Sequence, residues 1–172
     1  MLAAAVPVSA QAAIRSDPSL GMAQGRCRAN EPGPAFVVSA EGLKDRTGRL
    51  RLELYPPDDR DFLADDNVLV AAGKTFRRAE EPVPPSGPAT ICIRAPGPGT
   101  YTLSLLHDRD SNRKFGLSVD GIGFPGNPPL HLRKPEAASA RAVAGNGITH
   151  LNVRLNYRRG LLSFGPLQGM TR

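Results

Sequence analysis

The sequence has no tryptophan, only two cysteines, and few aromatic residues, three tyrosines and six phenylalanines in 172 residues. Beyond its N-terminal segment it has no uncharged apolar run of about 18 residues, the length a helix needs to cross a bilayer. A membrane-spanning helix is therefore not expected. Glycine and proline are abundant, at 18 and 17 residues, and both interrupt regular structure. The chain length suits one packed domain built from short elements and turns.

The first residues have the character of a signal peptide. Residues 1–12 are apolar and rich in alanine, and the segment Ala10-Gln11-Ala12 matches the small-x-small pattern that signal peptidase cleaves. The first charged residue is Arg15. We interpret residues 1–12 as the remainder of a signal peptide and predict a periplasmic or secreted protein. A disordered terminal tail is the alternative.

The two cysteines fit an oxidising compartment. Cys27 and Cys92 have neither a CxxC spacing nor a zinc-ligand spacing. A disulfide between them would close a loop of 65 residues, worth about 4 kcal/mol in the chain-entropy model, and would anchor an N-terminal extension over residues 13–34. Two free thiols are the alternative, but an oxidising compartment rarely leaves a pair unbridged.

Alternating apolar and polar residues predict half-buried strands. The clearest case is Arg49–Tyr55, where Leu50, Leu52 and Leu54 share one face and charged residues share the other. Tyr101–Leu105, Ile91–Ile93 and Leu151–Tyr157 repeat this pattern. Weaker candidates are residues 36–40, 75–80 and 139–144.

These segments favour an all-β fold, a seven-stranded antiparallel β-sandwich over residues 35–157 followed by a C-terminal tail over residues 158–172. Two connections, 56–73 and 108–136, are long enough to suggest function. If successive strands alternate in direction, the 41–48, 81–89 and 108–136 connections share one end of the sandwich. The acidic 56–73 connection, with five aspartates in residues 58–66, then lies at the other end. We expect it to be a solvated loop or a helix start.

The 108–136 connection begins like a calcium loop. Asp108, Asp110 and Asn112 offer oxygen ligands at the first, third and fifth positions. Arg113 stands where such a loop needs glycine, and Asp120 falls one position after the expected glutamate. We favour the alternative, a turn whose aspartates bind backbone N–H groups and pair with neighbouring arginines.

His107 and Asp108 form the one evident acid–base pair, and the sequence contains no G-x-S-x-G elbow. Neighbours on a strand point to opposite faces, so these two side chains need not meet. His107 has the same parity as Leu103 and Leu105, which predicts a half-buried histidine at one end of the core. An enzyme using His107 and Asp108 is therefore a second alternative, and we predict a protein that is not an enzyme.

Residues 121–126 match G-x-G-x-x-G by letter, but no helix follows, so a dinucleotide site is not expected. We interpret the segment as an irregular loop in which Phe124 plugs the core.

Several motifs occur together in an order that resembles a bacterial family. They are His107-Asp108, Asn112, Lys114, Gly121-Ile122-Gly123-Phe124 and Asn127, with 48–55, 61–63, 98–101 and the closing strand to Tyr157. In this order the chain, over roughly residues 35–157, resembles the family catalogued as domain of unknown function 2141. The resemblance implies a signal-bearing, transthyretin-like or immunoglobulin-like sandwich exported to the envelope, with no established activity. Arg113 and Gly116 replace a glycine and an acidic residue that are common in that family.

The formal charge of +6 reflects arginine, since all but four of the 22 basic residues are arginines. They are scattered, and stacking aromatics are scarce, so nucleic acid is not expected as a partner. An anionic envelope component or another envelope protein fits better.

We therefore predict an exported, envelope-associated module with a binding or structural role, and no cofactor, with calcium as the alternative. The predicted contact residues are His107, Asp108, Asp110, Asn112, Lys114, Phe124 and Asn127.

Overall fold

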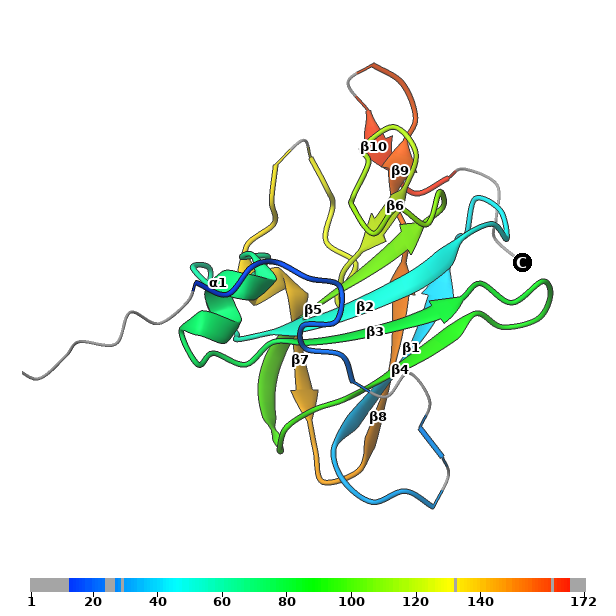
Figure 1. The fold of residues 1–172 in the computed structure, drawn as a ribbon. Helices are drawn as coiled ribbons and strands as arrows, with labels where there is room; N and C mark the ends of the chain where they lie inside the picture. The colour runs from blue at the N-terminus through cyan, green and yellow to red at the C-terminus, as the bar shows by residue number, and fades with distance from the viewer. Residues whose placement is uncertain (1–12, 24–26, 29, 132, 162, 168–172) are drawn as a thin grey trace, which may run out of the picture.

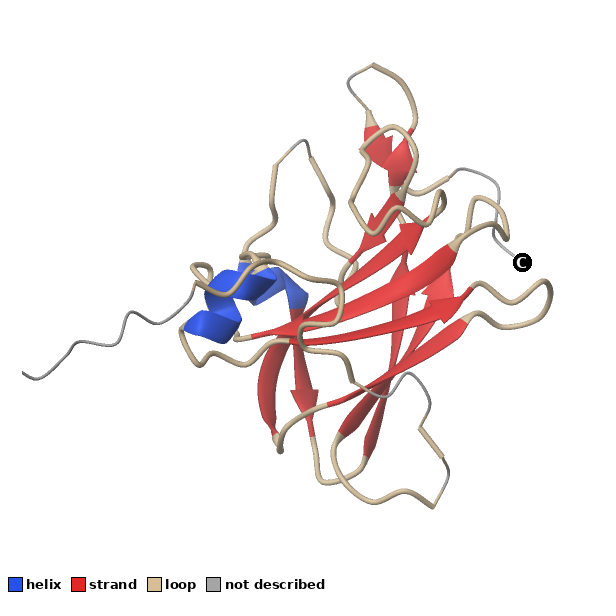
Figure 2. Ribbon diagram, viewed as in Figure 1, coloured by secondary structure: helices blue, strands red, loops and turns tan. Residues whose placement is uncertain are grey.

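Two β-sheets face one another in the computed structural model of the chain, which describes residues 13–23, 27–28, 30–131, 133–161 and 163–167. Figure 1 shows their order and Figure 2 the predominance of strands. The predicted signal peptide, residues 1–12, lies outside the described residues. The strands are β1 (Ala35–Glu41), β2 (Arg49–Tyr55), β3 (Arg77–Pro82), β4 (Thr90–Arg94), β5 (Gly99–Asp108), β6 (Gly121–Gly123), β7 (Arg141–Ala144), β8 (Ile148–Arg154), β9 (Tyr157–Arg158) and β10 (Phe164–Gly165). A short α-helix, α1 (Asp66–Ala71), and a 3₁₀ turn at Ala137–Ala140 complete the elements.

The larger sheet has the order β3-β2-β5-β6, and β7 pairs with the first half of β5. The alternation that predicted β2 is confirmed, because Leu50, Leu52 and Leu54 are fully buried. They pack against Phe36 and Val38 of the smaller sheet, which has the order β4-β1-β8. All seven predicted strand segments fall within or overlap strands, and the all-β prediction is confirmed.

The strand directions differ from the prediction at one pair. β1 and β8 are parallel, with Val38 opposite Leu151, so the sandwich is not purely antiparallel. The cause is a crossing between sheets, because β7 pairs with β5 in the larger sheet while β8, after a short turn, joins β1 in the smaller one. Parity along the chain does not fix direction when consecutive strands belong to different sheets.

β6 divides the 108–136 connection, which the sequence predicts as one loop. This strand pairs with the end of β5, Leu105 lying opposite Gly123 and His107 opposite Gly121. Only residues 109–120 therefore lie at the end of the sandwich that alternating strand directions predicted for the whole connection. Residues 124–136 run back toward the 56–73 connection, where Lys134 and Ala137 bind Asp59. The strand escaped prediction because it has three residues, of which two are glycines, and so it shows no alternation of side chains.

Both β6 glycines allow other strands to approach closely. A Cβ atom at Gly121 would overlap the Tyr157 ring, and one at Gly123 would overlap the carbonyl oxygen of Arg154. Between them, Ile122 and Asn156 exchange two backbone hydrogen bonds of 3.0 and 2.8 Å. The larger sheet is thereby joined to the chain that leaves β8.

The second hydrophobic cluster lies outside the space between the sheets. Phe62 and Phe124 pack edge to face there, with 5.7 Å between ring centroids. Tyr55, Leu69 and Leu130 belong to the same cluster. Phe124 thus packs against the 56–73 connection, as a core plug, rather than beside His107.

The predicted wet face of β2 is covered. Arg51 and Arg78 are buried in a ladder of ion pairs in which Glu53 accepts from Arg78 at 2.7 Å and Glu80 accepts from Arg51 at 3.1 Å. Residues 17–23 run along β3, and Ala23 N–H donates to the carbonyl of Arg78. The N-terminal extension therefore shields the edge of β3 and the Arg78 guanidinium, which donates to the carbonyls of Asp17 and Pro18.

The acidic 56–73 connection is less solvated than predicted. Asp61 is buried and pairs with Lys74, and Asp66, which begins α1, is buried against Arg78. The predicted helix start is confirmed, although these carboxylates bind basic side chains rather than water. No helix among the described residues is long and apolar enough to cross a membrane.

The expected C-terminal tail is partly built into the fold. β9 and β10 form a two-stranded sheet, with Phe164 opposite Arg158. Phe164 also contacts Phe115, with 6.3 Å between ring centroids. Residues 168–172 lie outside the described part of the chain.

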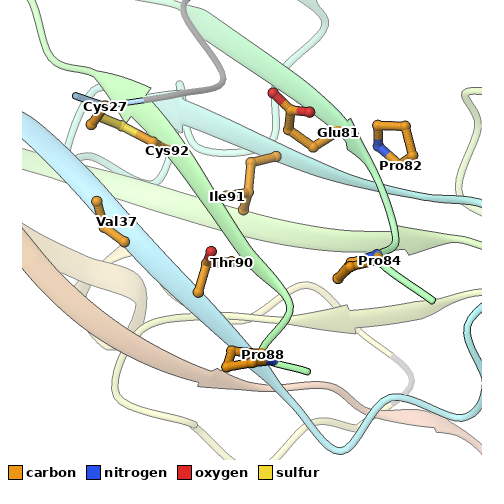
Figure 3. Close-up of a pocket in the computed structure, with 9 residues that line it drawn as sticks. All are labelled: Cys27, Val37, Glu81, Pro82, Pro84, Pro88, Thr90, Ile91 and Cys92. Carbon is orange, nitrogen blue, oxygen red and sulfur yellow. A yellow bond between two sulfur atoms is a disulfide. The ribbon is translucent and has the colours of Figure 1, made fainter. Parts of the chain in front are cut away.

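The predicted disulfide is present. Cys27 is bonded to Cys92 on β4, with 5.8 Å between the Cα atoms, and Figure 3 shows the bond at one end of a hollow between β3 and β4. The bond ties an extension that covers the larger sheet to a strand of the smaller one. It is therefore a link between the two layers.

Replacing both cysteines with serine should lower the free energy of unfolding by about 4 kcal/mol, because the 65-residue loop is then open in the unfolded chain. Urea unfolding of the oxidised protein and of the Cys27→Ser/Cys92→Ser variant checks this. The intact mass before and after reduction verifies that the bond was present. Equal stability of the two proteins would mean that the extension needs no covalent anchor.

Candidate functional site

His107 is the best enclosed of the predicted site residues. It is fully buried, its Nε2 lies 2.8 Å from the carbonyl oxygen of Thr47, and its Nδ1 lies 2.7 Å from the hydroxyl of Tyr157. A carbonyl accepts only, so Nε2 carries the proton and Nδ1 accepts from Tyr157. The Tyr157 hydroxyl in turn accepts from Lys44 N–H. Burial lowers the pKa of His107, and the Thr47 carbonyl opposes this only in part.

His107 and Asp108 do not act on each other. Asp108 is fully buried, and its two carboxylate oxygens accept hydrogen bonds from Asn112 N–H and Arg113 N–H at 3.1 and 2.9 Å. The prediction that His107 lies on the same core-facing side of β5 as Leu103 and Leu105 is confirmed, and His107 is fully rather than half buried. Both ring nitrogens are occupied by partners from its own chain, which is the arrangement of a structural histidine.

Three carboxylates meet at the start of the 109–120 loop. Asp108, Asp110 and Asp120 each offer an oxygen within 4.8 Å of the others. The predicted residues Asp108 and Asp110 are thus brought together, and Asp120, which the calcium-loop pattern placed one position too late, completes the group. The loop reaches this geometry through Ser111 and Arg113, which both adopt positive φ.

The carboxylates are already hydrogen-bonded within the loop. Asp120 accepts from Arg109 N–H at 2.9 Å and from Gly116 N–H at 2.7 Å, and Asp110 accepts from the backbone and side chain of Asn112. This matches the favoured interpretation of a turn capped by its aspartates. The predicted pairing of the loop aspartates with neighbouring arginines differs in its partner. Arg109 binds Asp45, outside the loop, and lowers the pKa of that carboxyl. Burial raises the pKa of Asp108, with the Asp120 charge acting in the same direction.

The remaining predicted contact residues are dispersed. Asn112 accepts from Lys114 N–H through its side-chain oxygen, and the Lys114 side chain is exposed. Asn127 adopts positive φ, and its side-chain oxygen accepts from Arg154 N–H at 2.7 Å, so it holds β8. Phe124 alone reaches the cavity described next.

An apolar cavity of about 430 Å³ opens between the two long connections. We call it the loop cavity. It is lined by Leu63, Phe115, Leu117, Ile122, Phe124, Leu130, His131, Arg133, Lys134, Pro135 and Phe164. Most of these residues come from the 108–136 connection, with Leu63 from the 56–73 connection and Phe164 from β10. The buried Phe124 and Leu130 are the part of the lining that is anchored in the second hydrophobic cluster.

Exposed apolar side chains stand at this cavity. Phe115 and Leu117 are 45% and 41% exposed. Arg133 and Lys134 bring positive charge to the same lining, and none of its described residues is acidic. Apolar walls with few polar groups are typical of small-molecule sites.

Two other cavities are more polar. One, of about 350 Å³, lies beside the disulfide and is lined by Glu81, Thr90 and three prolines among others (Figure 3). Another, of about 320 Å³, contains Arg154 and Arg159 and shares Leu130 and Phe164 with the loop cavity.

Sequence reasoning missed most of the loop cavity. Three of its residues lie in segments that do not alternate apolar and polar side chains: Phe115, Leu117 and Ile122. Phe164 lies in the predicted C-terminal tail. One signal was present, since Phe115 and Leu117 are large apolar residues within a polar loop, and such residues often mark contact sites.

The match to a family model covers residues 38–152, and the family is described as uncharacterized protein conserved in bacteria (DUF2141). The chain belongs to this family. No curated protein matches the chain, and no solved structure does either. The expectation from the motifs around His107 and Asn127 is thereby confirmed at the level of the family.

Acidification should destabilise the protein through His107. Because burial lowers the pKa of His107 in the folded state, the unfolded chain takes up a proton below about pH 6.5 before the folded chain does. The free energy of unfolding should fall as the pH drops from 7.5 to 5.5, and His107 adds up to about 1.4 kcal/mol per pH unit to that slope.

Urea unfolding of the wild type and of His107→Gln across this range measures the contribution of His107. The matched control is His150→Gln, because His150 is exposed and should leave the slope unchanged. If His107→Gln does not fold, the ring signals of His107 in an NMR titration of the wild type give the answer. A ring that titrates with the ordinary histidine pKa would contradict this account.

Proposed function

We propose that this protein is an exported module of the bacterial envelope that binds a small apolar ligand in the loop cavity and performs no catalysis. One observation carries the proposal. The two long connections, which are the least regular parts of the chain, come together around a space of about 430 Å³, within the range of roughly 300–1,000 Å³ typical of ligand sites.

The arrangement of polar groups supports binding over catalysis. Catalysis by His107 would require a ring nitrogen free to exchange a proton with a substrate, whereas both nitrogens bind groups of the same chain and the ring is fully buried. The loop cavity lies on the other side of β6, where apolar side chains predominate.

The disulfide supports an extracytoplasmic location. Bonds such as Cys27–Cys92 form and persist in oxidising compartments and are rare in the cytosol. The small-x-small pattern at Ala10–Ala12 points in the same direction.

A neutral fluorescent probe, N-phenyl-1-naphthylamine, should bind the folded protein with increased emission. The double variant Phe115→Ser/Leu117→Ser should bind it at least ten-fold more weakly, because each apolar side chain withdrawn from the ligand removes about 1 kcal/mol or more of contact. Fluorescence titration measures both affinities, and the absence of tryptophan leaves the emission window clear.

The matched control for this experiment is Val143→Ser. Val143 is an exposed apolar residue of β7, which pairs with the far half of β5. It should leave probe binding unchanged. Undiminished binding by the Phe115/Leu117 variant, or no binding by the folded wild type, would refute the proposal.

A calcium-stabilised module is a second candidate, favoured by the meeting of Asp108, Asp110 and Asp120. Oxygen ligands of this kind suit a hard cation, and an ion would offset the mutual repulsion that contributes to the raised pKa of Asp108. Hydrogen bonds to the carboxylates leave lone pairs for such an ion.

If this second function holds, calcium at ten times its dissociation constant should raise the thermal midpoint by about 3–5 °C over the chelated protein. Asp110→Asn should abolish the calcium-dependent part, and Asp58→Asn, a change of the same charge in the 56–73 connection, should retain it. Differential scanning calorimetry measures the midpoints. A midpoint indifferent to millimolar calcium removes this candidate.

A further inference from the structure

The geometry points to a ligand class for the loop cavity: we infer that it takes a single-chain anionic amphiphile, a fatty acid, with the hydrocarbon inside the cavity and the carboxylate at Arg133 and Lys134. This inference rests on the proposed function and goes beyond it by naming the substrate class.

The hydrocarbon has a continuous apolar path. Phe124 and Leu130 are buried and contribute to the second hydrophobic cluster, against which Leu63, Ile122 and Phe164 also pack. These side chains come from separate segments and all line the cavity. Methylene groups placed among them would be removed from water, which is favourable by about 0.8 kcal/mol for each group.

The cationic groups of the lining lack carboxylate partners. The Lys134 ammonium donates to the backbone carbonyl of Asp59 at 2.9 Å and lies 5.5 Å from the centre of the Phe62 ring. Arg133 forms no ion pair with a described residue, whereas nine ion pairs of arginine or lysine neutralise much of the charge elsewhere on the described chain. Both side chains therefore retain the capacity to bind an anion.

Local geometry holds these cations at the apolar surface. His131 and Arg133, which both line the cavity, form an isolated antiparallel bridge with each other. Asp59, whose backbone carbonyl accepts from Lys134, already binds Ala137 N–H through its carboxylate at 2.6 Å. The described lining of the apolar space thus carries Arg133 and Lys134 and no carboxylate, which is complementary to an anionic headgroup.

The carboxylate requirement separates this ligand from other apolar molecules. Dodecanol is at least as apolar as dodecanoate and has the same chain, so burial of hydrocarbon cannot favour the acid. A preference for the acid must come from the cations. The same comparison leaves the proposed function intact if only the choice of ligand is wrong.

The experiment is displacement of N-phenyl-1-naphthylamine from the wild type by dodecanoate and by dodecanol. Dodecanoate should bind at least ten-fold more tightly than dodecanol, and its affinity should weaken as salt is added. Lengthening from decanoate to dodecanoate should tighten binding roughly ten-fold, as expected when two more methylene groups are buried.

Arg133→Gln should weaken dodecanoate binding by three- to ten-fold and leave dodecanol binding unchanged, as should Lys134→Gln. The unchanged binding of the alcohol shows that each variant is folded with its cavity intact. The matched control is Arg28→Gln. Arg28 is an exposed arginine next to Cys27, which is bonded to Cys92 on β4 of the smaller sheet. It should alter neither affinity.

Each other outcome overturns the inference in a recognisable way. Equal displacement by acid and alcohol leaves an apolar site without anion selectivity, and the proposed function survives. Binding of the protein to phosphatidylglycerol vesicles, with no displacement of the probe by dodecanoate, assigns the exposed Phe115 and Leu117 to a membrane surface instead. No probe binding by the wild type removes the proposed function together with this inference.

Discussion

The pairing of Ile122 with Asn156 is the constraint on which the position of the loop cavity depends. Two backbone hydrogen bonds there join β6 to the chain leaving β8, and so connect the larger sheet with the smaller one. The contact needs glycine at 121 and 123, because a side chain at either position would collide with Tyr157 or with the backbone at Arg154. The bridge sends residues 124–136 toward the 56–73 connection and creates the space that becomes the loop cavity.

The two sides of this bridge differ in how far their polar groups are satisfied. On the His107 side, the imidazole and the three aspartates bind groups of their own chain, and the result is a closed hydrogen-bond network. On the cavity side, Arg133 and Lys134 face an apolar surface without an acidic partner in the lining. Positive charge without a carboxylate partner beside apolar surface is the basis of the proposed ligand site, whereas the closed network around His107 is structural.

Much of the sandwich was predictable because alternation is a local property. The leucines of β2, the parity of His107 and the pairing of Cys27 with Cys92 follow from spacing and compartment, and each agrees with the structure. Burial of Arg78 was not predictable, since its guanidinium donates to the carbonyls of Asp17 and Pro18 in the N-terminal extension. The same holds for the parallel pairing of β1 with β8, which depends on a crossing between sheets.

The sequence by itself determined the fold class, the family, the disulfide and the close approach of Asp108 to Asp110, because these depend on composition, on period-two patterning and on residues near one another in the chain. Only the tertiary structure decided that Asp120 joins the aspartates, that Phe124 turns away from His107, and that Phe115 meets Phe164. The physical reason is that these contacts depend on β6, a strand of three residues. Its pairing partners lie far away in the sequence, and no local pattern in the sequence indicates such a contact.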